Sequence, residues 1–505
     1  MSTAEPLDVL IVGAGISGIG MAAHLAMDCP GKTYALFERR DRLGGTWDLF
    51  RYPGVRSDSD MFTLGYAFAP WRAERSIAAG ETIRDYLERV ASEHGVAERI
   101  RYGRKVIAAD WDSTAGLWRV QADGPDGPET HAARFLFMGS GYYDYDTPHD
   151  PAIPGLERFA GAVVHPQFWP ETLDWAGKRV IVIGSGATAA TLVPAMAVSA
   201  AHVTMLQRTP TWYVAQAATD RMANLLRRLL PEKWAYALIR WRNRTLNAFL
   251  FNRARAKPAE TGAWLARQAE AALGPAWRAE DFTPPYGPWE QRLCLIPDGD
   301  LFTVLREGQA SVVTGTIAAV EPEGVRLANG ELQPADIIVT ATGLKIAALG
   351  KVALSLDGEP VNFAEHFWYR DCMLSNVPNF AVLFGYLNAS WTLRVDIVAD
   401  WLCRLFRQTD TWRVDVVTPV LPEDHALEEV QPLDMFSSGY LQRARDIVPK
   451  SARTAPWRLH MDYAEDRREL TAAPIDDGWL AFQRIAAPKG TFGQSGNLVE
   501  PAEPA

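Results

Sequence analysis

The chain has 505 residues, of which 48% are hydrophobic and 22% are charged, and its formal net charge is −10. This length predicts two or three domains with large cores, and the negative charge argues against general nucleic-acid binding. The four cysteines form no CxxC pair, so neither a metal site nor a dithiol redox centre is indicated, and a reducing, cytoplasmic setting is expected. Residues 1–10 carry no secretory signal, and no apolar run is long enough to cross a bilayer.

The chain opens with a strand, a glycine-rich turn and a helix. The apolar stretch 7–12 runs into the pattern GxGxxG, and an Ala- and Met-rich helix continues to residue 26. In such a turn the glycines permit the bend, admit a pyrophosphate and let helix and strand pack closely. The next strand, 33–37, ends at Glu38, where a carboxylate can accept hydrogen bonds from ribose hydroxyls; the alternative is a solvated charge. The residues expected to bind this dinucleotide are Gly13, Gly15, Ser17, Gly18 and Glu38.

Residues 44–58 combine two adjacent glycines, a tryptophan, a Tyr-Pro-Gly turn and an aspartate. Composition alone would make this segment a surface loop. Strands are expected at 104–109 and 111–121, and a buried strand from Phe135 ends in the small residues 139–141. From residue 142 to 154 the chain is rich in Tyr, Asp and Pro, and we place the first domain boundary there.

Residues 159–170 read Phe-Ala-Gly-Ala-Val-Val-His-Pro-Gln-Phe-Trp-Pro and fit F-x-G-x-x-x-H-x-x-x-W-P at every specified position. This stretch lies between two nucleotide folds, so two binding units must be coupled there. Taken alone, a histidine such as His165 is more often structural than a catalytic base. The residues alone therefore favour a structural role for His165, and a coupling role for His165 and Trp169, without chemistry, is what the family resemblance described below implies.

A second strand, turn and helix begin at residue 178. The strand 178–183 leads into Gly-Ser-Gly-Ala-Thr-Ala, in which alanine replaces the third glycine, and a helix follows from 190 to about 198. Two such units predict two dinucleotides. The next strand, 202–206, is followed by Arg208, which can pair with a ribose 2′-phosphate and so favours NADPH; the alternative is a plain surface charge. The residues expected to bind this second dinucleotide are Gly184, Ser185, Gly186, Ala187, Thr188, Ala189, Arg208 and Thr209.

Between Arg221 and Lys257 ten Lys or Arg residues stand against one acid, Glu232, which gives a local charge of +9. Apolar residues at helical spacing predict a basic amphipathic helical insertion over about 212–280. The insertion is either a lid or subdomain over the active site, or a peripheral contact with an anionic membrane. Basic helices with Trp and Phe on the apolar side lie in such an interface.

The later part of the chain returns to the first fold. The strand at 336–343 closes the second fold, and a hydrophobic strand is expected at 379–386. Residues 387–391 lead into a helix near 392–406, whose N-terminus can stabilise negative charge. The end, 490–505, is rich in Gly, Pro, Ser and Glu and is expected to be a disordered tail.

These motifs together resemble Baeyer–Villiger monooxygenases. The pattern at 159–170 marks that family, and 44–58 is similar to its second signature, G-G-x-W-x-x-x-x-Y-P-G-x-x-x-D. The strings 51–60, 291–294 and 388–392 look most like the ethionamide-activating monooxygenase subgroup, and the similarity runs from about residue 7 to about 487.

The resemblance implies an α/β protein with two Rossmann-like domains. Its FAD-binding domain would comprise 1–150 and 346–489, and its NADP-binding domain 178–345, with 151–177 linking them. The resemblance adds Gly45, Thr46, Trp47, Tyr52, Asp58 and Val106 to the FAD site, and Arg56 and Ser57 to the NADP site. Arg292 corresponds to the family's active-site arginine, which Asp58 would hold in place, although Gln291 stands where the family often has Lys; a loop-anchoring role is the alternative for Arg292.

The implied activity is insertion of one oxygen atom of O2 next to a ketone carbonyl, with NADPH reducing FAD and Arg292 stabilising anions in the reaction. Sulfides and thioamides would be further substrates. The rival hypotheses are an N- or S-oxygenating flavin monooxygenase and a non-catalytic flavoprotein that binds NADPH.

Overall fold

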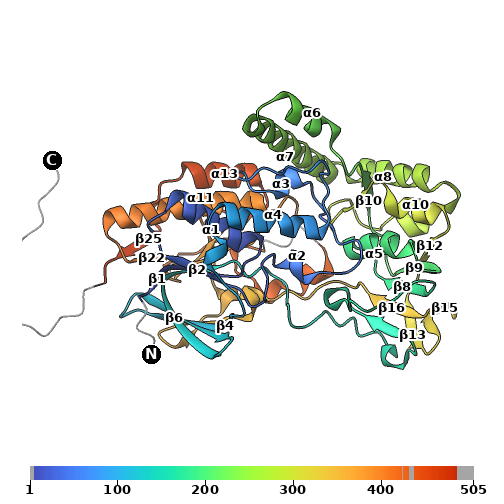
Figure 1. The fold of residues 1–505 in the computed structure, drawn as a ribbon, viewed down its shortest axis with the longest axis horizontal. Helices are drawn as coiled ribbons and strands as arrows, with labels where there is room; N and C mark the ends of the chain where they lie inside the picture. Colours follow the sequence, from blue (N-terminus) through green and yellow to red (C-terminus); the bar gives the residue numbers. More distant parts are fainter. Residues whose placement is uncertain (1–4, 423–424, 432–436, 486–505) are drawn as a thin grey trace, which may run out of the picture.

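Two nucleotide folds lie side by side, and a group of helices packs along one edge of both (Figure 1). The structure is a computed structural model that describes residues 5–422, 425–431 and 437–485. The predicted tail, 490–505, lies outside the described residues.

The first fold is built on a nine-stranded mixed sheet with the order β18-β17-β4-β5-β6-β1-β2-β3, and β21 also pairs with β6. β1, β2 and β3 run parallel because helices connect them, whereas β4, β5 and the start of β6 form an antiparallel meander. The strands are β1 (Leu7–Val12), β2 (Tyr34–Phe37), β3 (Ile100–Arg101), β4 (Lys105–Asp112), β5 (Leu117–Gly124), β6 (Gly127–Met138), β17 (Ala353–Leu356), β18 (Glu359–Pro360) and β21 (Phe380–Val382). Chain segments before and after the second fold therefore share one sheet.

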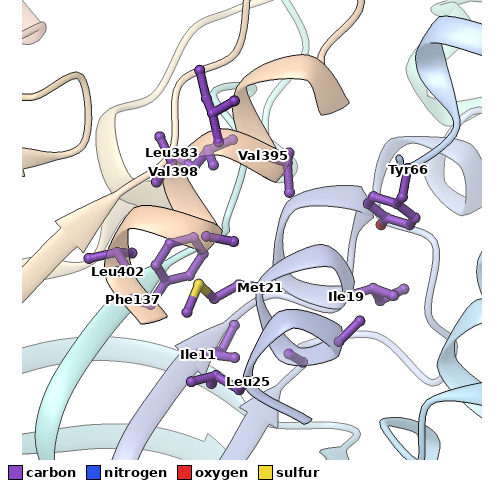
Figure 2. Close-up of a cluster of buried hydrophobic side chains, with 14 of the residues drawn as sticks. Ile11, Ile19, Met21, Leu25, Tyr66, Phe137, Leu383, Val395, Val398 and Leu402 are labelled. Carbon is purple, nitrogen blue, oxygen red and sulfur yellow. The ribbon is translucent and has the colours of Figure 1, made fainter. Parts of the chain in front are cut away.

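The core of the first fold is a packed layer between two helices from opposite ends of the chain. α1 (Ile16–Asp28) lies against α11 (Thr392–Trp412), and Figure 2 shows Met21 of α1 on the side toward Leu402 of α11, whereas Ile19 lies on the side toward Tyr66. Helix contact is so close that a Cβ on Gly20 would lie 2.4 Å from Val395 Cγ1. This packing fixes the N-terminus of α11 beside the first glycine turn.

A buried ionic network anchors α11 to α13 (Tyr463–Ala472). Arg394 Nη2 lies 2.7 Å from Asp466 Oδ2, and neither side chain is exposed to solvent. Burial alone would lower the pKa of His460, but hydrogen bonds to Asp371 and Asp466 raise it to about 10. The imidazolium therefore belongs to the same network of charges.

The second fold is a parallel five-stranded sheet with the order β12-β9-β8-β16-β7. Its elements are β7 (Ala162–Val164), β8 (Arg179–Ile183), α5 (Ala187–Ala197), β9 (His202–Gln207), α10 (Asp300–Arg306), β12 (Ala310–Thr314) and β16 (Ile337–Thr340), with an antiparallel flank of β13 (Ile317–Glu321), β14 (Gly324–Leu327) and β15 (Leu332–Pro334). Residues 151–177 were expected only to link the folds. They also supply the edge strand β7, because the backbone of residues 162–164 pairs with β16.

The helical insertion comprises α6 (Arg221–Leu229), α7 (Glu232–Ala256), α8 (Pro258–Leu273) and α9 (Ala279–Phe282). Tyr236 and Ile239 on one face of α7 enter the core of the first fold, whereas Gly262 of α8 packs on Trp212 of the second. Among the described residues, no helix combines the length and the apolar character needed to span a membrane.

Shorter elements complete the described chain. They are α2 (Thr46–Leu49), α3 (Met61–Leu64), α4 (Gly80–Glu93), β10 (Tyr213–Gln216), β11 (Cys294–Pro297), β19 (Trp368–Tyr369), β20 (Met373–Leu374), β22 (Val416–Pro419), β23 (Glu429–Val430), α12 (Gly439–Gln442), β24 (Ser451–Ala452) and β25 (Leu480–Gln483), with single 3-10 turns between them. The strand expected at 379–386 is only β21, because its last residue, Val382, pairs with Met138 at the end of β6 and the chain beyond has no strand to join.

Candidate active site

A cavity of about 310 Å³ lies between the two folds. Its walls come from the first glycine turn, from the start of α5 behind the second, and from the segments around residues 44–59, 139–146, 344–352 and 386–391, and Arg292 is among the lining residues. The cavity therefore gathers parts of the chain that are far apart in the sequence.

The first glycine turn leaves no room for side chains. Gly13 has φ +97°, and a Cβ on Gly18 would lie 1.9 Å from Gly13 O. A Cβ on Gly15 would approach Gly45 Cα at 3.4 Å, so the two glycines face each other across a narrow gap. α1 begins after Gly15 without a side-chain cap, which leaves its first N–H groups for an anion. Gly13, Gly15 and Ser17 line the cavity, and Gly18 supports the turn from behind.

Glu38 lies at the end of β2, as predicted, and lines the cavity. It is 4% exposed, and its two carboxylate oxygens accept hydrogen bonds from Ala14 N at 2.8 Å and Arg40 N at 2.9 Å. Burial raises the pKa of this carboxyl above its usual value. Glu38 is therefore no solvated surface charge, and its position beside the turn suits ribose hydroxyls.

The segment 44–58 runs along the cavity wall and is not a free surface loop. Gly45, Thr46, Trp47 and Tyr52 all line the cavity, as does Val106 from β4. The Tyr52 hydroxyl is hydrogen-bonded to the Thr188 side chain at the start of α5, and burial raises its pKa to about 12. The first fold thus reaches the second through this segment.

Arg292 and Asp58, separated by more than 200 residues in the sequence, meet on the cavity wall. Arg292 Nη2 lies 2.6 Å from Asp58 Oδ2, and the side chains are 35% and 40% exposed. Both groups can therefore be reached from the cavity while they hold each other. Their pairing is the geometry that the resemblance implied.

Arg56 and Ser57 line the same cavity but already have protein partners. Arg56 forms an ion pair with Asp300 at the start of α10, and the Ser57 hydroxyl accepts a hydrogen bond from Ala78 N at 3.1 Å. These contacts fix the segment before Asp58 against the second fold. A dinucleotide would contact Arg56 and Ser57 only in addition to these bonds.

The second glycine turn meets the cavity at the start of α5. Gly184 has φ +134°, and its Cβ would lie 2.3 Å from Ala341 O, whereas a Cβ on Gly186 would meet nothing within 4 Å. Ala187 and Thr188 line the cavity. Six other residues predicted for the second dinucleotide do not: Gly184, Ser185, Gly186, Ala189, Arg208 and Thr209.

Arg208 lies just beyond the end of β9, is exposed, and forms no ion pair with any residue in the described part of the chain. Thr209 O accepts a hydrogen bond from the Ser185 hydroxyl at 3.0 Å, which places Arg208 close to the second glycine turn. An exposed cation here is available to a phosphate.

His165 and Trp169 lie outside the cavity lining. His165 Nδ1 accepts a hydrogen bond from Gln167 N at 3.2 Å, and burial lowers the pKa of His165. Gln167 Nε2 in turn donates to Asp144 O at 2.6 Å, and Trp169 packs edge-to-face on Trp175. These contacts join the segment between the folds to the cavity wall, which agrees with a coupling role.

Several cavity residues were missed by the sequence reasoning, which treated residues 142–154 only as a boundary. Tyr142 stacks on Trp391 with ring centroids 5.2 Å apart and the planes 12° from parallel. Lys351 Nζ lies 2.6 Å from Asp144 Oδ1, and this bond helps to lower the pKa of Asp144 although burial opposes it. Three tyrosines in four residues were an available signal of an aromatic wall.

Comparison with known proteins gives consistent matches. Residues 75–253 match a family described as flavin-binding monooxygenase-like, and residues 11–69 match an NAD(P)-binding Rossmann-like domain. MymA of Mycobacterium tuberculosis is 47% identical over 488 residues, which cover 95% of this chain and 98% of MymA. The FAD-containing monooxygenase EthA of the same organism is 44% identical, with 96% of this chain and 99% of EthA covered.

Solved structures share the fold. A steroid monooxygenase bound to NADP superimposes with a TM-score of 0.78 at 23% identity, covering 95% of this chain and 100% of that one. A cyclohexanone monooxygenase in its open form gives a TM-score of 0.74 at 19% identity, with the same coverage.

Proposed function

Because this chain belongs to the flavin-binding monooxygenase-like family, we propose that it is an FAD- and NADPH-dependent Baeyer–Villiger monooxygenase. It would insert one oxygen atom of O2 next to a ketone carbonyl and release an ester or lactone. The observation that carries the proposal is the Arg292–Asp58 pair on the wall of a cavity that residues of both glycine turns line.

The first fold suits FAD. The turn around Gly13 has space for a pyrophosphate but none for added side chains, and the uncapped start of α1 offers N–H groups to its charge. Glu38 supplies carboxylate oxygens for a ribose, and Trp47 and Tyr52 supply flat faces along the cavity. EthA, at 44% identity, is an FAD-containing monooxygenase, which supports the same cofactor here.

The second fold suits NADP(H). α5 begins after Gly186 with no side-chain cap and with open space beside that glycine. Arg208 offers a guanidinium without an ion-pair partner among the described residues, and a 2′-phosphate is the group that it would bind. We assign the pyrophosphate to the residues around Ala187 and Thr188.

Bound FAD, once reduced by NADPH, would supply an activated oxygen atom from O2. Arg292 faces the cavity, and its positive charge would stabilise the negative charge that develops on the carbonyl oxygen of the ketone. Asp58 acts through Arg292 and is a positioning residue, because its carboxylate holds the guanidinium at 2.6 Å. The proposed reaction requires no side-chain nucleophile.

Product analysis tests this function directly. The purified holoenzyme is incubated with NADPH, O2 and either phenylacetone, a 2-alkanone or an alkyl aryl sulfide. Ester from the ketones, formed in proportion to NADPH oxidised, is the expected result. Sulfoxide without ester would replace the proposal by the S-oxygenating monooxygenase, and NADPH binding without any oxygenated product would replace it by the non-catalytic flavoprotein.

The cellular location stays a prediction. A cytoplasmic setting was inferred from the isolated cysteines, which are all buried and free in the structure.

A further inference from the structure

The helices α6 and α7 carry an unusual concentration of exposed apolar side chains. Of the seventeen large apolar residues that are exposed in the described chain, ten lie between residues 222 and 250. Trp234 is 74% exposed and Trp241 55% exposed. We call this the α6–α7 surface; its apolar members are Met222, Leu225, Leu229, Leu230, Trp234, Leu238, Trp241, Leu246, Phe249 and Leu250.

Four of these residues on α7 and three on α6 form a stripe along one side of their helix. Trp234, Leu238, Trp241 and Phe249 follow one another by three, four or eight residues along α7, so they share one side of the helix. Met222, Leu225 and Leu229 do the same on α6, which packs beside α7 at the edge of the molecule (Figure 1). Contiguous apolar areas of this kind mark interaction sites.

The opposite side of α7 accounts for the stability of the insertion. Tyr236 and Ile239 are buried in the core of the first fold, and Asn243 Nδ2 donates to Asp60 Oδ1 at 2.9 Å. Arg240 Nη2 lies 2.7 Å from Asp396 Oδ2. α7 thus packs on the first fold with one side, no residue of α6 or α7 lines the cavity, and the outer apolar stripe of α7 has no role in that packing.

Positive charge surrounds the stripe. Arg221, Arg228, Lys233 and Arg255 are exposed and form no ion pair with the described residues. The one acidic residue in this stretch, Glu232, is already paired with Arg72 at 2.8 Å. The surface therefore combines tryptophan, aliphatic groups and uncompensated cations in a protein whose net charge is −10.

We propose that the α6–α7 surface docks the protein on an anionic phospholipid membrane. Tryptophan prefers the interface between headgroups and acyl chains, and a basic amphipathic helix lies in that plane with its cations on the lipid phosphates. A second copy of the chain suits the surface less well, because a twofold contact would place the cations of both copies together. The proposal is independent of the reaction that the cavity carries out.

Vesicle co-sedimentation of the full-length holoenzyme tests the docking. The protein is mixed with vesicles of phosphatidylcholine alone or of phosphatidylcholine with phosphatidylglycerol, at low and at moderate salt. Binding to the anionic vesicles that weakens with salt is expected. Each cation at the surface contributes about fivefold to the partition constant, so Arg228→Gln with Lys233→Gln should weaken binding by about 25-fold.

Two further variants separate apolar insertion from general charge. Trp234→Glu with Trp241→Glu should lower binding by at least about tenfold, because two exposed indoles lose their place in the interface. Val198→Glu changes an apolar residue on the second fold that is more exposed than either tryptophan, and it should leave binding unchanged. All variants should keep their bound flavin and their turnover of a water-soluble substrate, which shows that they fold.

The results decide whether a membrane or a second copy of the chain covers the α6–α7 surface. No binding to anionic vesicles at low salt, or binding that neither pair of substitutions weakens, overturns the proposal. So does a dimer in sedimentation velocity that the tryptophan substitutions dissociate, because the surface would then be covered by a second copy.

Discussion

The contact between Asp58 and Arg292 predicts a specific pattern of kinetic defects. The pair is 2.6 Å long but more than a third exposed on both sides, so it contributes about 0–1 kcal/mol to folding and neither residue is needed for the fold. A preorganised charge aimed at a developing oxyanion is worth more, about 2.7–4 kcal/mol. Arg292→Ala should therefore lower kcat for ester formation by about 10²–10³-fold while FAD stays bound.

Asp58→Ala should have a smaller effect, a fall of about tenfold or less, because the guanidinium keeps its charge and loses only its orientation. If Asp58 works only through Arg292, the double variant should be no slower than Arg292→Ala alone. The assay is the initial rate of ester formation at saturating NADPH, with flavin absorbance as the check on cofactor content. Arg51→Ala is the matched control, since Arg51 is comparably exposed, pairs with Glu171 at 2.8 Å and lies outside the cavity lining.

Two results would refute this reasoning. Undiminished ketone turnover by Arg292→Ala would remove the arginine from the reaction. Losses that multiply in the double variant would mean that Asp58 contacts substrate or cofactor in its own right.

Three other changes have definite expected outcomes. Arg208→Gln should raise KM for NADPH by about tenfold or more and leave KM for NADH unaltered, because only NADPH carries the 2′-phosphate whose charge-assisted bond is lost; an unchanged cofactor preference would place that phosphate elsewhere. Gly18→Ala should purify without FAD, since its Cβ would lie 1.9 Å from Gly13 O, whereas Gly31→Ala, with nothing within 4 Å, should stay yellow; absorbance spectra decide. His460, with a pKa raised from 6.5 to about 10, contributes stability that is complete below pH 6.5 and lost as the pH rises through 10; Tm should fall across that window, and His460→Asn should flatten the fall.

The two nucleotide folds could be predicted because their signals are local. The strand at 7–12 and the turn after it fit one short pattern, and the structure places β1 at Leu7–Val12 and α1 directly behind the turn. Glu38 followed from its distance to that turn. Where a single segment contains all the information, reading the sequence was sufficient.

Contacts between distant segments could not be predicted in the same way. The Arg56–Asp300 pair and the stacking of Tyr142 on Trp391 each join residues more than 200 positions apart, and no local pattern links them. The pairing of Arg292 with Asp58 was reached only through a family resemblance.

Periodicity also failed to show which apolar face of α7 is buried. Trp234 and Trp241 have large apolar side chains but are exposed to solvent, whereas Tyr236 and Ile239 are buried in the core. A helix with apolar residues on two sides can bury either side, and the elements that pack against it determine which side is buried.

The packing of α1 against α11 determines when, during synthesis of the chain, the first fold can be completed. Gly20 and Val395 touch in the finished fold, yet a ribosome must make the whole second nucleotide fold and α11 before they can meet. Until then the apolar side of α1 that Figure 2 shows has no cover, and the cavity lacks the wall around Trp391. The chain should therefore bind flavin only after α11 has been synthesised. A fragment that stops before α11 should stay incompletely folded in the cell.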